Sequence, residues 1–119
     1  MKLIWIYSLL ASALLVGCKS AADSSARFSS PNGEWVLEVD STDHGAIAPA
    51  VTVVNLHASK DSWDAENNVL IVPGVHTVSA TWKNNSTVQI DCIQCPMGDA
   101  DLITAKKGPV WILYEGVNP

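Results

Sequence analysis

Short stretches of alternating apolar and polar residues recur along the chain from residue 34 onward. In Glu34–Asp40 the apolar residues Trp35, Leu37 and Val39 occupy every second position, which is the period of a half-buried antiparallel strand. Further β-rich runs cover residues 51–56, 69–72, 75–82, 87–92 and 110–115. No segment after residue 18 has the period of an amphipathic helix. We therefore expect an all-β fold, a small antiparallel sandwich or open barrel of about five to seven strands.

Turn-forming residues separate these runs. Ser29–Gly33 contains Pro-Asn-Gly, in which proline presets an early turn position and glycine accepts positive φ. Lys83–Ser86 is rich in asparagine and predicts the turn of a hairpin. His57–Asn68 predicts a long polar loop, and Cys95–Pro109 predicts a second loop with a short strand at 102–105.

The first residues differ from this pattern. Lys2 precedes an apolar stretch, Leu3–Val16, that is interrupted only by two serines. A helix that spans a bilayer needs about 20 apolar residues, so this stretch predicts a cleaved signal peptide rather than a permanent membrane helix. Residues 19–30 are rich in Ser and Ala without a hydrophobic period, which predicts a flexible tether.

The end of the apolar stretch, Leu15-Val16-Gly17-Cys18, resembles the lipobox of bacterial lipoprotein precursors in every position. The resemblance implies that the Cys18 thiol receives diacylglycerol, that cleavage follows Gly17, and that the new amino terminus is acylated. It divides the chain into a signal peptide (1–17), a lipidated N-terminus and tether (18–30), and a single β domain (31–119). Two or three acyl chains would anchor the mature protein stably.

The resemblance also implies where the protein is located. Lys19 and Ser20 follow the cysteine, with no aspartate at the next position. By analogy with Gram-negative sorting, this favours the periplasmic face of the outer membrane. In a Gram-positive cell the same anchor would hold the protein on the outer face of the plasma membrane.

The charge of the mature part limits its partners. It has twelve Asp and Glu residues, six Lys and Arg residues, and no basic cluster. Nucleic acid is therefore not an expected partner. The expected partners are the membrane, through the lipid anchor, and an envelope protein of unknown identity.

Two segments of the mature part resemble a family of small, uncharacterised bacterial lipoproteins and envelope proteins. One is the turn and strand Ser30-Pro31-Asn32-Gly33-Glu34-Trp35-x-Leu37, and the other is the hairpin from Trp82 to Ile90. The family has no known activity, so the resemblance supports the β fold and leaves the function open.

Cys92-Ile93-Gln94-Cys95 is the one motif with potential redox or metal chemistry. Exported chains enter an oxidising compartment, which favours a structural disulfide. Three extended residues span about 10 Å, beyond the roughly 7 Å limit between bridged Cα atoms, so the strand must end at Cys92 and turn. The alternatives are a redox-active pair, which requires a helix that does not follow here, and a soft-metal site with Met97.

No catalytic constellation is apparent. His44, His57 and His76 match no metal-ligand spacing, and His76 is expected on the apolar face of a strand as a core residue. We expect no enzymatic activity, no metal and no cofactor. Trp35, Trp82 and Trp111 are expected in the core or in cross-strand pairs, whereas Trp63, in the polar loop, is a candidate contact residue.

These features favour a lipid-anchored, non-enzymatic protein that acts through binding or structure. One specific form is an inhibitor of an enzyme that targets the envelope. The alternative is a protein that handles thiols or metals through Cys92 and Cys95.

Overall fold

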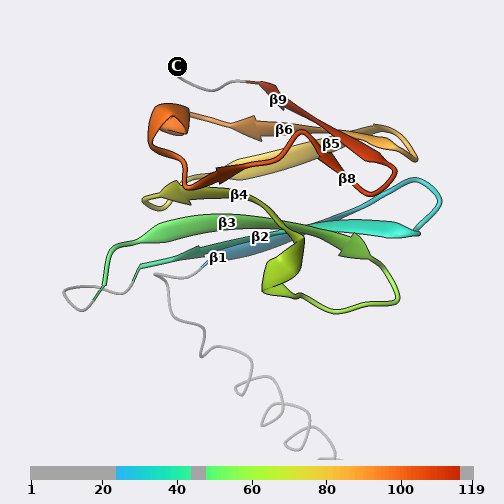
Figure 1. Ribbon diagram of the computed structural model, residues 1–119, viewed down its shortest axis with the longest axis horizontal. Helices are drawn as coiled ribbons and strands as arrows, with labels where there is room; N and C mark the ends of the chain where they lie inside the picture. The colour runs from blue at the N-terminus through green and yellow to red at the C-terminus, as the bar shows by residue number, and fades with distance from the viewer. Residues whose placement is uncertain (1–23, 44–47, 116–119) are drawn as a thin grey trace, which may run out of the picture.

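The chain folds as a sandwich of two β-sheets in the computed structural model, which describes residues 24–43 and 48–115 (Figure 1). The first sheet contains, in spatial order, β1 (Ser24–Ser29), β2 (Trp35–Thr42), β3 (Val51–Ala58), β4 (Asn68–Pro73) and β7 (Leu102–Ile103). The second contains β5 (Val78–Asn84), β6 (Thr87–Cys92), β9 (Val110–Glu115) and β8 (Lys106–Lys107). Two short 3-10 helices, η2 (Ala65–Asn67) and η3 (Met97–Asp99), lie in the connections. The prediction of an all-β sandwich is confirmed, and the strands described number nine rather than five to seven.

The core lies between the two sheets and is built from the alternating residues of their central strands. Leu37 of β2 faces Leu56 of β3 in the register, and both side chains are fully buried. Val88 and Ile90 of β6 fill the core from the second sheet and are equally buried. Burying a side chain of this size contributes about 1.5–3 kcal/mol, so these positions dominate the stability of the domain.

Most predicted strands are confirmed. The runs 87–92 and 110–115 coincide with β6 and β9, and the runs 51–56 and 69–72 lie within β3 and β4. The fourth predicted strand, 75–82, is wrong at its start, because β5 begins at Val78.

The segment before β5 is a tight connection rather than a strand. Gly74 has φ +90°, and its carbonyl accepts a hydrogen bond from the Thr52 hydroxyl (2.7 Å). The backbone N–H of His76 donates to the same hydroxyl oxygen (3.0 Å), and the ring nitrogen Nε2 of His76 forms a hydrogen bond with the Pro73 carbonyl (2.7 Å). His76 is therefore a half-buried turn residue, and the expectation that it lies on the apolar face of a strand is wrong.

The predicted tether also needs correction. Residues 24–29, which were expected to be flexible, form β1, the edge strand of the first sheet. Phe28 pairs with Leu37 and packs against the core, and its carbonyl accepts a hydrogen bond from Trp82 Nε1 (3.1 Å). One partly buried aromatic and the ladder of backbone bonds to β2 fix this strand, although its sequence has no hydrophobic period.

Among the described strands, one pair departs from the antiparallel expectation. β6 and β9 run parallel, with Val88 opposite Ile112 and Ile90 opposite Tyr114. Parallel neighbours need a crossover connection, and residues 93–109 supply it by adding β7 to the first sheet and β8 to the second.

Among the described residues, no helix has the length and apolarity needed to cross a bilayer.

The two segments that carry the family resemblance contact each other. In the predicted turn before β2, Gly33 has φ +74°, and the N–H of Gly33 donates to the Ser30 carbonyl (2.9 Å). The N–H of Asn32 in that turn donates to Asn85 Oδ1 in the β5–β6 hairpin (2.9 Å). The two motifs therefore join the first sheet to the second at this end of the sandwich.

Candidate binding surfaces

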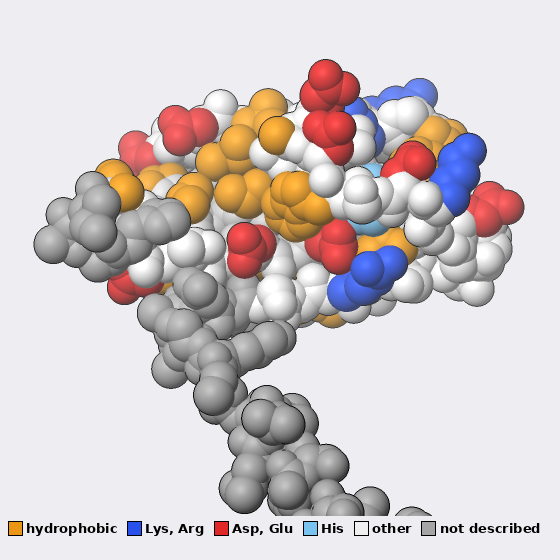
Figure 2. Space-filling model, turned by 90° about the horizontal axis from the view of Figure 1, so that it is seen from below, with side chains coloured by type: hydrophobic (Ala, Val, Ile, Leu, Met, Phe, Trp, Pro, Cys, Tyr) orange, Lys and Arg blue, Asp and Glu red, His pale blue; other side chains and the backbone are white. Residues whose placement is uncertain are grey.

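The polar loop of residues 59–67 folds over the outer face of the first sheet, on the side away from the second sheet (Figure 1). It carries Trp63, whose side chain is 39% exposed. On one side of Trp63 lies a hollow of about 360 Å³ that Arg27, Glu38 and Asp40 also line. On the other side lies a hollow of about 420 Å³ within the loop itself. Figure 2 shows this face, with hydrophobic side chains gathered in the middle and acidic side chains bordering them.

The loop is held in place by buried hydrogen bonds. The fully buried Asn55 of β3 donates from Nδ2 to the Asp64 carbonyl (2.6 Å) and to Asn68 Oδ1 (2.8 Å). Asp64 caps η2 by accepting the Glu66 N–H (3.0 Å), and Lys107 Nζ donates to the Glu66 carbonyl (3.0 Å). Before Trp63, the N–H of Ser59 donates to the Glu34 carbonyl (2.8 Å), so Trp63 projects from a loop that is hydrogen-bonded on both sides of it.

The side-chain amide of Asn55, which holds this loop, is a buried polar group. The Oδ1 atom of Asn55 is buried and has no hydrogen-bond partner among the described residues. An unsatisfied buried acceptor costs about 1–3 kcal/mol. The two bonds from Nδ2 offset this cost only if they order the loop that covers them, so Asn55 acts as a positioning residue for the loop.

Beneath the same face, three side chains are linked in a row across β1, β2 and β3. Arg27 Nη1 lies 3.3 Å from Glu38 Oε1, and Glu38 Oε2 lies 2.7 Å from His57 Nε2. The other ring nitrogen of His57, Nδ1, donates to the Ala58 carbonyl (2.7 Å), since a carbonyl can only accept. The contact between His57 Nε2 and Glu38 Oε2 is therefore a second hydrogen bond of the ring, and it joins β3 to β2.

This arrangement leaves His57 without a free nitrogen. Its side chain is only 1% exposed, and both ring nitrogens are occupied. His57 was expected in the polar loop, but it belongs to β3 and is buried. Its role is to bind β3 to β2 under the loop, and it is not placed to contact a ligand.

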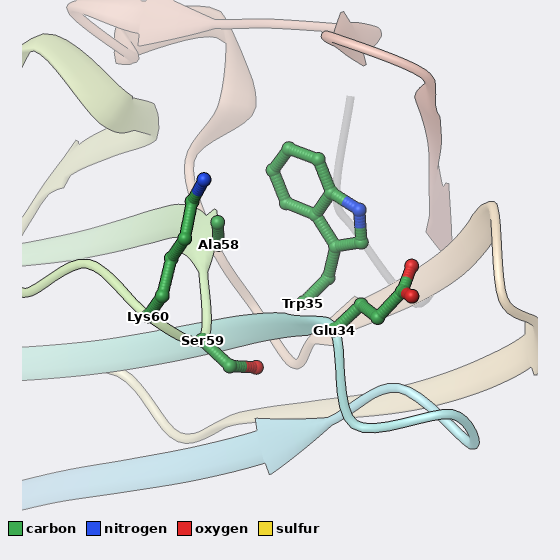
Figure 3. A pocket seen from close by; sticks show the side chains of 5 residues that line it. All are labelled: Glu34, Trp35, Ala58, Ser59 and Lys60. Atoms are coloured by element: carbon green, nitrogen blue, oxygen red, sulfur yellow. The ribbon is translucent and has the colours of Figure 1, made fainter.

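A third hollow lies at the end of the sandwich where β2 begins and β3 ends, and its volume is about 420 Å³. Trp35 and Ala58, which are cross-strand partners, line it together with Glu34, Ser59 and Lys60. Figure 3 shows Lys60 and Trp35 extending to the same side of the sheet, with Ala58 between them and the Glu34 carboxylate beyond the indole ring. Lys60 lies in the turn that follows β3, and no pattern in the sequence pointed to this hollow.

Cys92 and Cys95 lie at disulfide-bonding distance. β6 ends at Cys92, the chain turns through Gln94 (φ +59°), and the Cα atoms of Cys92 and Cys95 are 5.5 Å apart. This confirms the predicted turn after Cys92. Both cysteines are fully buried in the core cluster, against which Met97 packs.

Other predicted site residues are not brought together. Gly17, Cys18 and His44 lie outside the described residues. Within residues 24–43 and 48–115, no group of three or more His, Cys, Asp or Glu side chains is arranged to hold a metal ion.

The outer face of the second sheet exposes Trp111, which was expected in the core or in a cross-strand pair. Trp111 is 52% exposed, and Lys106 Nζ lies 4.5 Å from the centroid of its ring. The apolar run 110–115 has two nearly equivalent faces, and Val110 and Ile112 occupy the inner one. Of the two expected positions, core or cross-strand pair, Trp111 therefore has the second, with Lys106 of β8 as its cross-strand partner, whereas Trp35 and Trp82 pack against the core.

We compared the chain with protein-family models, with curated proteins and with solved structures, and found no match in any of the three.

Proposed function

We propose that the protein is a lipid-anchored, extracytoplasmic binding module that presents Trp63 to a protein partner. Cys18 would carry the lipid, and six residue steps separate it from Ser24, the first residue of β1. That length spans about 20 Å at most, so the sandwich would stay close to the membrane. The periplasmic face of the outer membrane, or the outer face of the plasma membrane in a Gram-positive cell, is the corresponding location.

The observation that carries the binding role is the exposed Trp63 on a preorganised loop. Aromatic side chains held in a fixed position bind well, because little conformational entropy is lost when the partner docks. The hollows on both sides of Trp63 offer space for side chains of a partner. Glu38 and Asp40 outnumber Arg27 in one hollow, and Asp61 and Asp64 outnumber Lys60 in the other. This excess of acidic side chains favours a partner with basic residues around an apolar centre.

In vivo photocrosslinking tests this proposal, with the photoreactive residue introduced at Ser62, beside Trp63. We expect one predominant crosslinked partner, whose yield falls when Trp63→Ala is added and when the salt concentration is raised. Trp111→Ala is the matched control, because it removes a comparably exposed tryptophan from the opposite sheet. Equal yields for the two variants would contradict the assignment of the surface.

A separate experiment tests the anchor. Cys18→Ala should abolish lipidation and leave unprocessed or soluble precursor, measured by membrane fractionation and by mass spectrometry of the mature amino terminus. Normal membrane attachment of this variant would refute the lipoprotein assignment without affecting the Trp63 test.

The burial of both sulfur atoms supports binding over the alternative role in thiol or metal handling. A thiol that exchanges with a substrate must be accessible as a thiolate, and neither Cys92 nor Cys95 has exposed surface. If the captured partner were an enzyme that attacks the envelope, the protein would be its inhibitor, and loss of that enzyme's activity on binding would identify this form.

A further inference from the structure

The hollow beside Trp35 combines two opposite charges with an aromatic wall. Lys60 and Glu34 both line it, and neither side chain forms a hydrogen bond or an ion pair within the described part of the chain. Figure 3 shows the Lys60 ammonium and the Glu34 carboxylate on opposite sides of the indole. Both charges are therefore available to a ligand.

The apolar part of the hollow is fixed by packing. Trp35 packs against the core, and the β8–β9 turn passes close to the far edge of its ring. A Cβ atom added to Gly108 would lie 3.4 Å from Trp35 Cη2. The Ala58 methyl group forms the surface between Trp35 and Lys60. At about 420 Å³, the hollow is in the size range of pockets that hold small ligands.

We propose that this hollow binds a zwitterion whose carboxylate and ammonium groups are separated by a short apolar chain. The carboxylate would pair with Lys60, the apolar chain would lie over Trp35 and Ala58, and the ammonium group would pair with Glu34. Free ω-amino acids and the C-terminal lysine of a peptide share this chemistry.

Simpler ligands fit the charges less well. An anion alone would leave Glu34 unpaired beside it, and a cation alone would leave Lys60 unpaired. An ordinary α-amino acid carries both charges on adjacent carbon atoms, so it cannot reach two groups that an indole ring separates. The site therefore selects for the spacing between the charges as well as for their signs.

NMR titration of the folded protein tests the proposal, with the indole resonances of Trp35 as the readout and 6-aminohexanoate as the probe. We expect saturable shifts and an affinity about two- to fivefold higher than for hexanoate or hexylamine, since an exposed ion pair contributes a modest amount of binding energy. Glycine should cause no shift. No saturable shift with 6-aminohexanoate, or equal affinity for all three six-carbon probes, would overturn the proposal.

Variants identify the groups involved. Lys60→Gln and Glu34→Gln should each weaken 6-aminohexanoate about two- to fivefold, and Ala58→Leu should abolish binding by filling the hollow while both charges remain. Lys83→Gln, at an exposed position on β5, is the control and should bind as the wild type does. If Lys60→Gln and Lys83→Gln bound equally, the assignment would be wrong.

A further pair of probes separates the two sources of the ligand. Tighter binding of a peptide that ends in lysine than of 6-aminohexanoate would assign the site to a protein terminus, and the C-terminal amide of that peptide should then bind more weakly. Binding of 6-aminohexanoate alone would assign it to a small molecule.

Discussion

Reduction of the Cys92–Cys95 pair should lower the stability of the domain by a modest and calculable amount. If the two cysteines are bonded, they close a ring of four residues. On the chain-entropy estimate, so small a ring stabilises the folded state by about 2 kcal/mol. A small domain loses about 1–3 kcal/mol per molar urea, so the urea midpoint should fall by roughly 1–2 M in the presence of a reductant.

The burial of the pair adds a second, separable expectation. Both cysteines are fully buried among core residues. Cys92→Ala combined with Cys95→Ala removes two packed sulfur atoms as well as the bond, and each lost atom should cost about 1 kcal/mol. The double variant should therefore be about 2 kcal/mol less stable than the reduced wild type. The reasoning would be refuted if the native protein contained two free thiols with a bound metal, or if reductant left the midpoint unchanged.

Three other predictions concern single side chains. Burial raises the pKa of Tyr114 to about 12, so folding favours the neutral phenol, and the domain should lose stability as the pH rises from about 10 to 12. In urea denaturation from pH 8 to 12, Tyr114→Phe should remove this loss. The prediction fails if the free energy of unfolding depends on pH equally in the variant and the wild type. Asn55→Ala should destabilise the domain by about 1–3 kcal/mol and speed hydrogen exchange in residues 59–67 more than in the core; uniform exchange would argue against its positioning role. Leu37→Ala should cost about 2–5 kcal/mol, whereas Leu113→Ala, at an exposed position, should change stability by less than about 0.5 kcal/mol; similar losses would contradict the assigned core.

The alternation of apolar residues predicts the fold where one strand face is buried and the other is solvated. Residues 87–92 satisfy this condition, and β6 has those bounds. Residues 24–29 do not satisfy it, because an edge strand can be fixed by backbone bonds and one aromatic such as Phe28. The parallel pairing of β6 with β9 is set by the crossover through residues 93–109, and no local pattern reports it.

The candidate sites were predictable only in part, for a similar reason. Trp63 stands out because it is an aromatic residue in a polar segment. His57 appears as a loop residue from its polarity, and its burial makes sense only once Glu38, nineteen positions earlier in the chain, is known to lie beside it. The hollow beside Trp35 requires the register between β2 and β3, which sequence alternation does not supply.

The two proposed sites share one loop and one side chain on it, Lys60. Lys60 lines the hollow beside Trp35 and also the hollow within the loop on one side of Trp63, which follows three positions later. A flexible loop would transmit a movement of Lys60 to Trp63. Here the N–H of Ser59 donates to the Glu34 carbonyl (2.8 Å), and Asn55 holds the carbonyl of Asp64. Backbone bonds to the sheet therefore fix the loop before Lys60 and after Trp63, which leaves the Lys60 side chain as the element common to both sites. A ligand that pairs with Lys60 in the hollow beside Trp35 withdraws its charge from the hollow beside Trp63, so the two binding events should be thermodynamically coupled.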